Sequence, residues 1–181
     1  MEFGELIKQR QSVRQYQQRP VEKALLDKLI EAVRLAPSAS NSQPWKLIIV
    51  DDPGLKAQVA QATFSPAVSF NKFAPEAPVI AIFTVEKAGL ITQVGAVLKQ
   101  RPFSLIDIGI AAAHFCLQAA ELGLGTCILG WFDERKIQRL LNIPRRTRIG
   151  LVVTVGYAAE GYPLRDKTRK AAGQMSGFNT Y

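Results

Sequence analysis

The sequence has few of the side chains from which most catalytic centres are built. Its 181 residues contain one histidine, His114, and two cysteines, Cys116 and Cys127. A serine or cysteine nucleophile normally needs a base beside it, and His114 stands in a helical pattern that we interpret as buried core. The cysteines form no C-x-x-C pair, so we expect two buried, reduced thiols and no metal site. Covalent hydrolase chemistry is therefore disfavoured.

Long hydrophobic runs and nucleotide-binding glycine motifs are also missing. The longest apolar run, Ile108 to Ala113, is far shorter than the roughly 20 residues of a membrane span. The first residues carry Glu2 and Glu5 and lack the basic-then-apolar layout of a signal peptide, so we expect a cytoplasmic protein without a membrane partner. No P-loop is present, and no G-x-G-x-x-G follows a strand.

Basic residues are in excess, but they are scattered along the chain. The formal net charge is +8, from 23 basic and 15 acidic residues, which is enough to attract anionic ligands. No basic recognition helix and no set of aromatic residues interleaved with lysine and arginine is present. We therefore expect small anionic ligands and no nucleic-acid partner.

Apolar periodicity predicts a single α+β domain over residues 1–181. The second helix is expected to open at Pro20 and to end at Pro37. Residues 64–78 and 86–104 give no clear pattern, and the last 24 residues lose periodicity but keep Phe178 and Tyr181, which predicts an arm that docks elsewhere. Helices are expected at 2–9, 20–36, 53–63, 105–122 and 134–141, and strands at 45–50, 79–85, 126–132 and 149–157.

Two basic clusters near the ends of the chain could form one anion site. Arg10, Ser12 and Arg14 form R-x-S-x-R, and Lys167 and Arg169 form K-x-R. A phosphate dianion is held best by several guanidinium and ammonium donors and a hydroxyl that converge from different directions. An anion site in a chain that has few candidate catalytic side chains favours a phosphorylated organic cofactor that carries out the chemistry itself.

Five stretches, in order along nearly the whole chain, resemble the nitroreductase family of flavoenzymes. The resemblance implies a nitroreductase-like α+β fold, in which a mixed, mainly antiparallel central sheet is flanked by helices and followed by a C-terminal extension. It also implies FMN as cofactor and a homodimer whose two flavin pockets each use both chains. The stretches are Arg10-Gln-Ser-Val-Arg14, Leu35-Ala-Pro-Ser-Ala-Ser-Asn-Ser-Gln-Pro-Trp45, Asp107-Ile-Gly109, Gly123-Leu-Gly-Thr-Cys127 with Ile-Leu-Gly130, and Lys167-Thr-Arg169.

The resemblance also assigns roles to individual residues. Arg14 matches a basic position near the flavin pyrimidine, where a cation would raise the electron affinity of the ring. For any one of the charged residues taken alone, a solvated surface charge is the better interpretation. The residues matched to the FMN phosphate and ribityl chain are Arg10, Gln11, Ser12, Lys167 and Arg169. The loop that covers the partner's flavin is matched by Pro37, Ser38 and Ala39. The strand end beside flavin N5 is matched by Ile128, Leu129 and Gly130, and an asparagine at the isoalloxazine edge is matched by Asn71.

The activity implied is that of an FMN-dependent oxidoreductase. A reduced nicotinamide, NADH or NADPH, would pass hydride to flavin N5, leave, and be replaced by a nitroaromatic, a quinone or a similar acceptor in ping-pong order, with no catalytic side chain. Two alternatives stay open. One is a flavin-binding, flavin-processing or dehalogenase-like relative without nitroreductase turnover, whose substrate-covering insertion could lie only in residues 86–104. The other is a phosphate-binding module without flavin.

Overall fold

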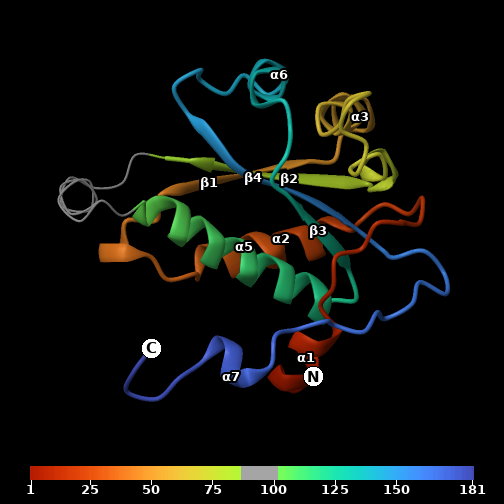
Figure 1. Ribbon diagram of the computed structural model, residues 1–181. Coiled ribbons are helices and arrows are strands. Elements are labelled where there is room, and N and C mark those ends of the chain that lie inside the picture. Colours follow the sequence, from red (N-terminus) through yellow and green to blue (C-terminus); the bar gives the residue numbers. More distant parts are fainter. Residues whose placement is uncertain (87–101) are drawn as a thin grey trace.

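The computed structural model describes residues 1–86 and 102–181, and its centre is a four-stranded sheet between two pairs of helices (Figure 1). The strands β1 (Trp45–Val50), β2 (Val79–Val85), β4 (Arg148–Gly156) and β3 (Gly125–Leu129) lie in that order, and each neighbouring pair is antiparallel. α2 (Lys23–Arg34) and α5 (Phe103–Glu121) cover one face, and α3 (Pro53–Gln61) and α6 (Glu134–Leu140) cover the other. The predicted α+β fold is confirmed.

β2 lies at the centre of the core because both of its faces are buried. Successive side chains of a strand point to opposite faces of the sheet. Ile80 and Ile82 pack in the cluster that contains Ile137 of α6. Phe83 packs on the other side, with its ring centroid 5.7 Å from that of Phe115 in α5. The sheet is therefore a fixed platform between two apolar layers, from which the loops of the site extend.

α5 is the most apolar helix that the structure describes. Its 19 residues are long and apolar enough to cross a membrane by composition alone. Ala111, Ala112, Phe115 and Ala119 are instead buried against the sheet and α2, so the apolar sequence is that of a core helix. Gly123, with a φ of +76°, follows the helix end, a conformation that glycine adopts without strain.

The prediction that His114 is a core residue is wrong. The side chain is half-buried. It lines an open groove of about 410 Å³ together with Phe3 and Leu6 of α1 (Phe3–Gln9) and Leu35 at the end of α2. A helix packed on one side of a sheet buries only one of its faces. Small apolar residues are so frequent along α5 that the sequence does not show which positions lie on the other face. The two cysteines are buried and unpaired, as expected.

Two element boundaries differ from the expectation by three residues, more than any of the others. α2 begins at Lys23 rather than Pro20, because Glu22 precedes it in extended conformation and its carboxylate accepts hydrogen bonds from Arg19 and Tyr157. β3 ends at Leu129, three residues before Phe132. The chain turns away there because the side-chain amide of Asn71 binds the Trp131 carbonyl oxygen at 3.2 Å.

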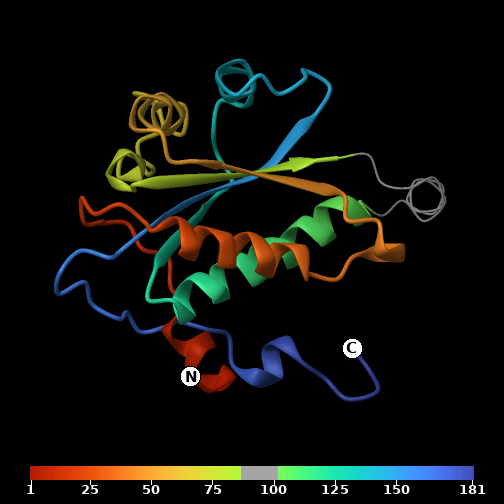
Figure 2. The same cartoon turned by 180° about the vertical axis from the view of Figure 1, so that it is seen from behind.

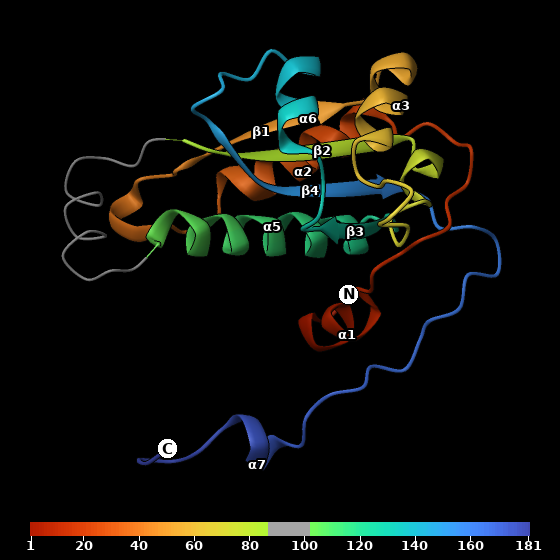
Figure 3. The same ribbon diagram turned by 45° about the horizontal axis from the view of Figure 1, so that its top comes forward.

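Both ends of the chain lie outside the layers of the sheet and its helices (Figure 2). α1 packs below α5, and the segment after β4 runs past it as an extended arm that ends in a short helix, α7 (Ala172–Met175), which the sequence did not predict. Figure 3 shows α7 and the last residues standing clear of the body. Met175, Phe178 and Tyr181 are exposed, so the last residues of the arm do not dock onto their own chain. Most of the unpatterned stretch 86–104 lies outside the described residues.

Candidate functional site

The two basic clusters from opposite ends of the chain meet, as the sequence predicted. They line a single cavity of about 320 Å³ between the segment after α1 and the arm after β4. Six of the predicted cofactor-binding residues line it, together with three residues that the sequence analysis did not single out. The lining residues are Arg10, Gln11, Ser12, Arg14, Arg165, Asp166, Lys167, Thr168 and Arg169.

The first cluster is held in place by a strand-like contact with the edge of the sheet. Ser12 forms a parallel bridge with Thr126 of β3, and the Val13 backbone N–H donates to the Thr126 carbonyl oxygen at 2.9 Å. Gly125 makes this approach possible, because a Cβ at that position would lie 2.6 Å from the Val13 Cγ2 atom. The G-L-G-T-C stretch thus positions the R-x-S-x-R cluster.

The arm is fixed against the same segment by hydrogen bonds that include side chains. The Gln11 Nε2 donates to the Pro163 carbonyl oxygen at 2.9 Å, and the Arg14 backbone N–H donates to the Tyr162 hydroxyl at 3.1 Å. The Lys167 Nζ donates to the Lys8 carbonyl oxygen. Because these bonds join positions about 150 residues apart, the arm has a defined path although it has no regular secondary structure.

Arg165 is the main site residue that the sequence analysis missed. Its Nη2 donates to the Ser12 carbonyl oxygen, and its backbone N–H donates to the Gln11 Oε1 at 3.1 Å. Arg165, Lys167 and Arg169 are alternate residues, and alternate side chains of an extended chain lie on one side of it. This R-x-K-x-R spacing in the sequence was the signal that could have identified Arg165.

The cavity is strongly cationic. Four guanidinium groups and the Lys167 ammonium line it against one carboxylate, that of Asp166, and Ser12 and Thr168 add hydroxyls. These are the donors that a phosphate dianion needs, so the residues present fit the phosphate end of FMN. Among the described residues there is no group of three or more histidine, cysteine or acidic side chains that could hold a metal.

The thiol nearest to this site is not a nucleophile. Burial raises the pKa of Cys127 above its usual value, although Arg14 and Ser12 act in the opposite direction. Burial likewise raises the pKa of Cys116. Both side chains therefore stay protonated at neutral pH, and reactivity requires the thiolate. The cysteines stabilise the core next to the site and do not take part in covalent chemistry.

The predicted flavin-covering loop, which contains Pro37, Ser38 and Ala39, lies elsewhere. It precedes β1 and includes the short turn η1 (Ala39–Asn41), in which Ser40 and Asn41 have positive φ values of 52° and 51°. The Asp107 Oδ1 in the first turns of α5 accepts a hydrogen bond from the Ala39 backbone N–H at 3.1 Å. Asp107 is buried, and its Oδ2 has no hydrogen-bond partner among the described residues.

The loop and the cationic cavity are separated by the length of α5. The loop contacts Asp107 near one end of the helix, whereas the R-x-S-x-R segment contacts Thr126 just beyond the other end. From Asp107 to Glu121 the helix advances by 14 residue steps, which span about 21 Å at 1.5 Å per step. The structure therefore brings together, in one chain, the residues predicted to bind phosphate, and it does not bring the loop to them.

The remaining predicted residues lie at the end of β3 and beside it. Ile128 and Gly130 are exposed, whereas Leu129 is buried. Asn71 is also buried, and its Nδ2 donates to the Thr63 carbonyl oxygen at 3.0 Å as well as to that of Trp131. Its amide hydrogens therefore fix the loop that follows β3, and its contact with a flavin stays a prediction.

Two aromatic contacts connect the end of β3 to the cationic cavity. The Phe70 and Trp131 rings pack edge to face with centroids 6.3 Å apart. The Arg14 guanidinium lies 6.0 Å from the centroid of the Phe73 ring. The segment 70–73, which contains the predicted residue Asn71, therefore lies beside both Arg14 and the loop that follows β3.

Comparison with known proteins agrees with this geometry. Residues 7–157 match the profile of the Nitroreductase family. The chain is 28% identical to an NADH dehydrogenase of Thermus thermophilus over 85% of this chain and 86% of the relative. It is also 28% identical to an iodotyrosine deiodinase of Thermotoga neapolitana over 88% of this chain and 90% of the relative.

The structural comparison leads to the same group. An FMN-dependent nitroreductase of Clostridium difficile superposes with a TM-score of 0.78 at 26% identity, over 97% of this chain and 98% of that one. A nitroreductase family protein of Clostridium novyi superposes with a TM-score of 0.76 at 28% identity, over 92% and 89% of the two chains. FMN, the cofactor expected from the sequence, is confirmed at the level of the family. Since the profile covers most of its residues, this chain is a member of the nitroreductase family of oxidoreductases.

Proposed function

We propose that residues 1–181 act as one domain that binds FMN and transfers electrons from NADH or NADPH to a small organic acceptor such as a nitroaromatic or a quinone. The observation that carries the proposal is the cavity in which four arginines, Lys167 and two hydroxyls converge from both ends of the chain. When bound, FMN supplies the chemistry, because it takes up a hydride from the nicotinamide, which leaves oxidised, and then reduces the acceptor in ping-pong order. The two unpaired cysteines support the cytoplasm as the compartment.

In this proposal the chain binds and orients the cofactor. Arg10, Ser12, Lys167 and Arg169 hold the phosphate, and Gln11 keeps the arm closed over it through Pro163. Guanidinium groups suit this task because they donate two parallel hydrogen bonds to a phosphate and remain charged at every physiological pH.

Arg14 is proposed to act on the ring rather than the phosphate. Reduction places negative charge around N1 and O2 of the flavin, and a nearby guanidinium stabilises that charge. The Arg14 side chain is exposed in the cavity, and its backbone is held by the Tyr162 hydroxyl, so the position of its Cα is fixed. Arg14→Ala is expected to lower the flavin reduction potential and to slow reduction by the nicotinamide while FMN stays bound.

The working unit is proposed to be a homodimer whose two sites each use both chains. Its support is the helix length that separates the Pro37–Ala39 loop from the cationic cavity of the same chain, together with the exposed apolar side chains of α1 and the arm. A two-fold partner can supply the loop that a single chain cannot.

Flavin content and turnover test the proposed function. The wild-type protein is expected to bind FMN and to oxidise NADH or NADPH faster when a quinone or a nitroaromatic is added. Lys167→Ala is expected to raise the FMN dissociation constant about tenfold or more, since it removes a charge-assisted contact. Arg146→Ala, which removes an exposed arginine outside the cavity, is the matched control. A protein that stays colourless with excess FMN would overturn the proposal.

Mixed dimers test the shared site. Lys167→Ala disables the cavity, and Ser38→Trp obstructs the loop, so that each homodimer should have two defective sites. In a heterodimer of the two variants, one site combines the intact cavity of one chain with the intact loop of the other. Such heterodimers should regain flavin in one of their two sites. If they bind no more flavin than the parent homodimers, each site lies within a single chain.

Dehalogenation is a second candidate, supported by the similarity to the iodotyrosine deiodinase along 88% of this chain. Both activities would use the same cavity and the same reduced flavin, and they differ only in the acceptor. Anaerobic incubation of the reduced holoprotein with a halogenated phenol, followed by measurement of released halide, distinguishes the two candidates. Halide release together with slow reduction of nitroaromatics and quinones would favour the dehalogenase.

A further inference from the structure

A second concentration of positive charge lies on α6 and the turn after it. Residues 133–148 contain six basic and two acidic residues, a net charge of +4, which is half of the +8 of the whole chain. Both carboxylates already have partners. Asp133 accepts a hydrogen bond from the Lys136 backbone N–H at 2.9 Å, and Glu134 forms an ion pair with Arg148 at 2.8 Å.

Three of these arginines surround a pocket. Arg135, Arg139 and Arg145 line a cavity of about 230 Å³ with Gln138 and Ile143. In the two described stretches, 1–86 and 102–181, no carboxylate lies within 4.0 Å of the three guanidinium groups. Three like charges around one cavity repel each other, so a multiply charged anion bound there would remove an unfavourable interaction.

Hydrogen bonds hold the pocket in shape without a ligand. The Arg135 Nη1 donates to the Arg145 carbonyl oxygen at 3.0 Å, which ties the helix to the turn. Gln138 is buried, and its Nε2 donates to the Thr147 carbonyl oxygen at 2.7 Å. The Ile143 backbone N–H donates to the Gln138 carbonyl oxygen at 2.9 Å. These contacts already fix Arg135, Gln138 and the turn, so binding would have to order only the exposed side chains of Arg139 and Arg145.

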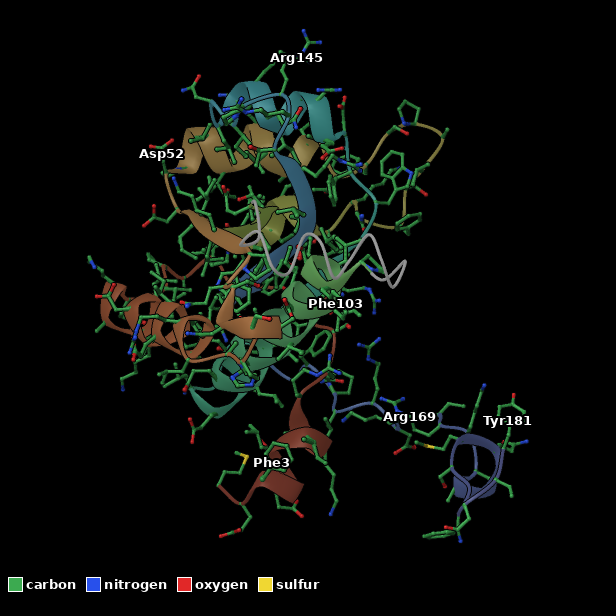
Figure 4. All side chains as sticks on the ribbon, turned by 90° about the vertical axis from the view of Figure 1, so that its left-hand side faces the viewer. Phe3, Asp52, Phe103, Arg145, Arg169 and Tyr181 are labelled. Atoms are coloured by element: carbon green, nitrogen blue, oxygen red, sulfur yellow. The ribbon has the colours of Figure 1, made fainter. Side chains whose placement is uncertain are left out.

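The pocket is separate from the flavin site. α6 covers the sheet face opposite α5, whereas the flavin cavity lies between the segment after α1 and the arm (Figure 1). In Figure 4, Arg145 and Arg169, one from each pocket, lie on opposite sides of the molecule. The proposed redox function leaves this second pocket unused.

We propose that the Arg135–Arg139–Arg145 pocket binds a phosphate group, either as a free phosphate or diphosphate ion or as the phosphate of a small metabolite. Guanidinium donors from two elements can form bidentate contacts to tetrahedral oxyanions. The concentration of three arginines around one concave pocket, which buried Ile143 also lines, favours a compact anion over an extended nucleic acid, which contacts basic residues spread along a surface.

Calorimetric titration of the protein saturated with FMN tests this proposal, because FMN keeps the first cationic cavity filled. The probes are inorganic phosphate, pyrophosphate and adenosine monophosphate at low ionic strength. Binding of the first two alone indicates a free ion, and tighter binding of the nucleotide indicates a metabolite. Arg139→Gln and Arg145→Gln remove pocket charges from side chains that have no hydrogen bonds among the described residues. Each is expected to weaken binding at least about tenfold.

Arg146→Gln is the matched control, because it removes the same charge from an exposed arginine that does not line the pocket. It is expected to weaken binding less than about twofold, by screened long-range attraction alone. Equal losses in all three variants would show diffuse attraction to a basic surface and would overturn the proposal. Absence of binding heat at millimolar phosphate and pyrophosphate, or tighter binding of a short oligonucleotide that depends equally on Arg146, would also overturn it.

Discussion

The core and the proposed flavin site of this protein are held by different forces. The core is the sheet with its four helices, where β2, β4 and α5 pack through side chains that water does not reach. The terminal clamp, defined here as residues 8–17 and 157–169, is anchored in the core by Val13 and Tyr16, and its remaining residues are held mainly by hydrogen bonds between largely exposed groups. Apolar burial contributes most to the folding free energy, whereas bonds exposed to water contribute little net stability but define geometry. We therefore expect core substitutions to change stability and clamp substitutions to change FMN affinity.

Phe115→Ala is expected to have the largest effect on the core. Phe115 is fully buried and packs edge to face on Phe83, so its removal leaves a cavity and should cost about 3–5 kcal/mol of unfolding free energy. Urea denaturation measures this loss. Phe178→Ala is the matched control, since that ring is 94% exposed and should matter by less than about 0.5 kcal/mol. Similar losses of unfolding free energy in both variants would contradict the conclusion that buried apolar side chains supply most of the stability.

Asp107 lies where the core meets the predicted flavin loop. Asp107→Ala leaves the Ala39 backbone N–H without its acceptor and should cost about 1–3 kcal/mol in the same assay. Asp107→Asn keeps an acceptor oxygen and should cost less. Asp27→Ala, which removes an exposed carboxylate paired with Lys23, should be almost neutral. If Asn costs as much as Ala, the carboxylate charge matters more than the hydrogen bond.

Arg165→Ala tests whether a residue of the terminal clamp affects FMN affinity rather than stability. The variant loses the two guanidinium hydrogen bonds to the Ser12 carbonyl oxygen and the Gln11 Oε1, together with one cavity charge, and it keeps the backbone bond to Gln11. Its FMN dissociation constant, measured by quenching of flavin fluorescence, should rise about tenfold. The unfolding free energy of the apoprotein should change by less than about 1 kcal/mol. A large loss of stability with unchanged FMN affinity would assign Arg165 to the core instead.

The smallest expected effect is a pH dependence of the unfolding free energy, which arises where Glu22 at the start of α2 contacts Tyr157 of the terminal clamp. Glu22 accepts a hydrogen bond from Tyr157 and another from Arg19, and mainly the Tyr157 bond lowers the pKa of Glu22 to about 2. A lowered folded-state pKa means that this carboxylate stabilises the fold above its usual pKa, near 4.5, and that the contribution disappears as the pH falls towards 2. Glu22→Gln should therefore destabilise the protein more at pH 6 than at pH 3. In a Tyr157→Phe background this pH dependence should be weaker, and an unchanged dependence there would exclude the hydroxyl as its cause.

Much of the fold followed from local patterns. The four strands and the main helices were predictable because their apolar periodicities are strong and their ends carry turn residues or caps, such as Asp52 and Asp133. The start of α2 and the end of β3 were not, because contacts made by Glu22 and Asn71 with distant segments decide them. The exposure of His114 escaped prediction for the same kind of reason, since the residue types of α5 do not reveal which side faces the sheet.

The sequence alone determined the family and the likeness of the two terminal clusters to a phosphate site, because residue type and spacing carry that information directly. Only the tertiary structure decided that the clusters share one cavity, that Arg165 belongs to it, and that the Pro37–Ala39 loop lies at the other end of α5. It also revealed the arginine pocket beside α6. The physical reason is that these features depend on contacts between residues far apart in the chain, such as Gly125 with Val13, and local composition does not encode such contacts.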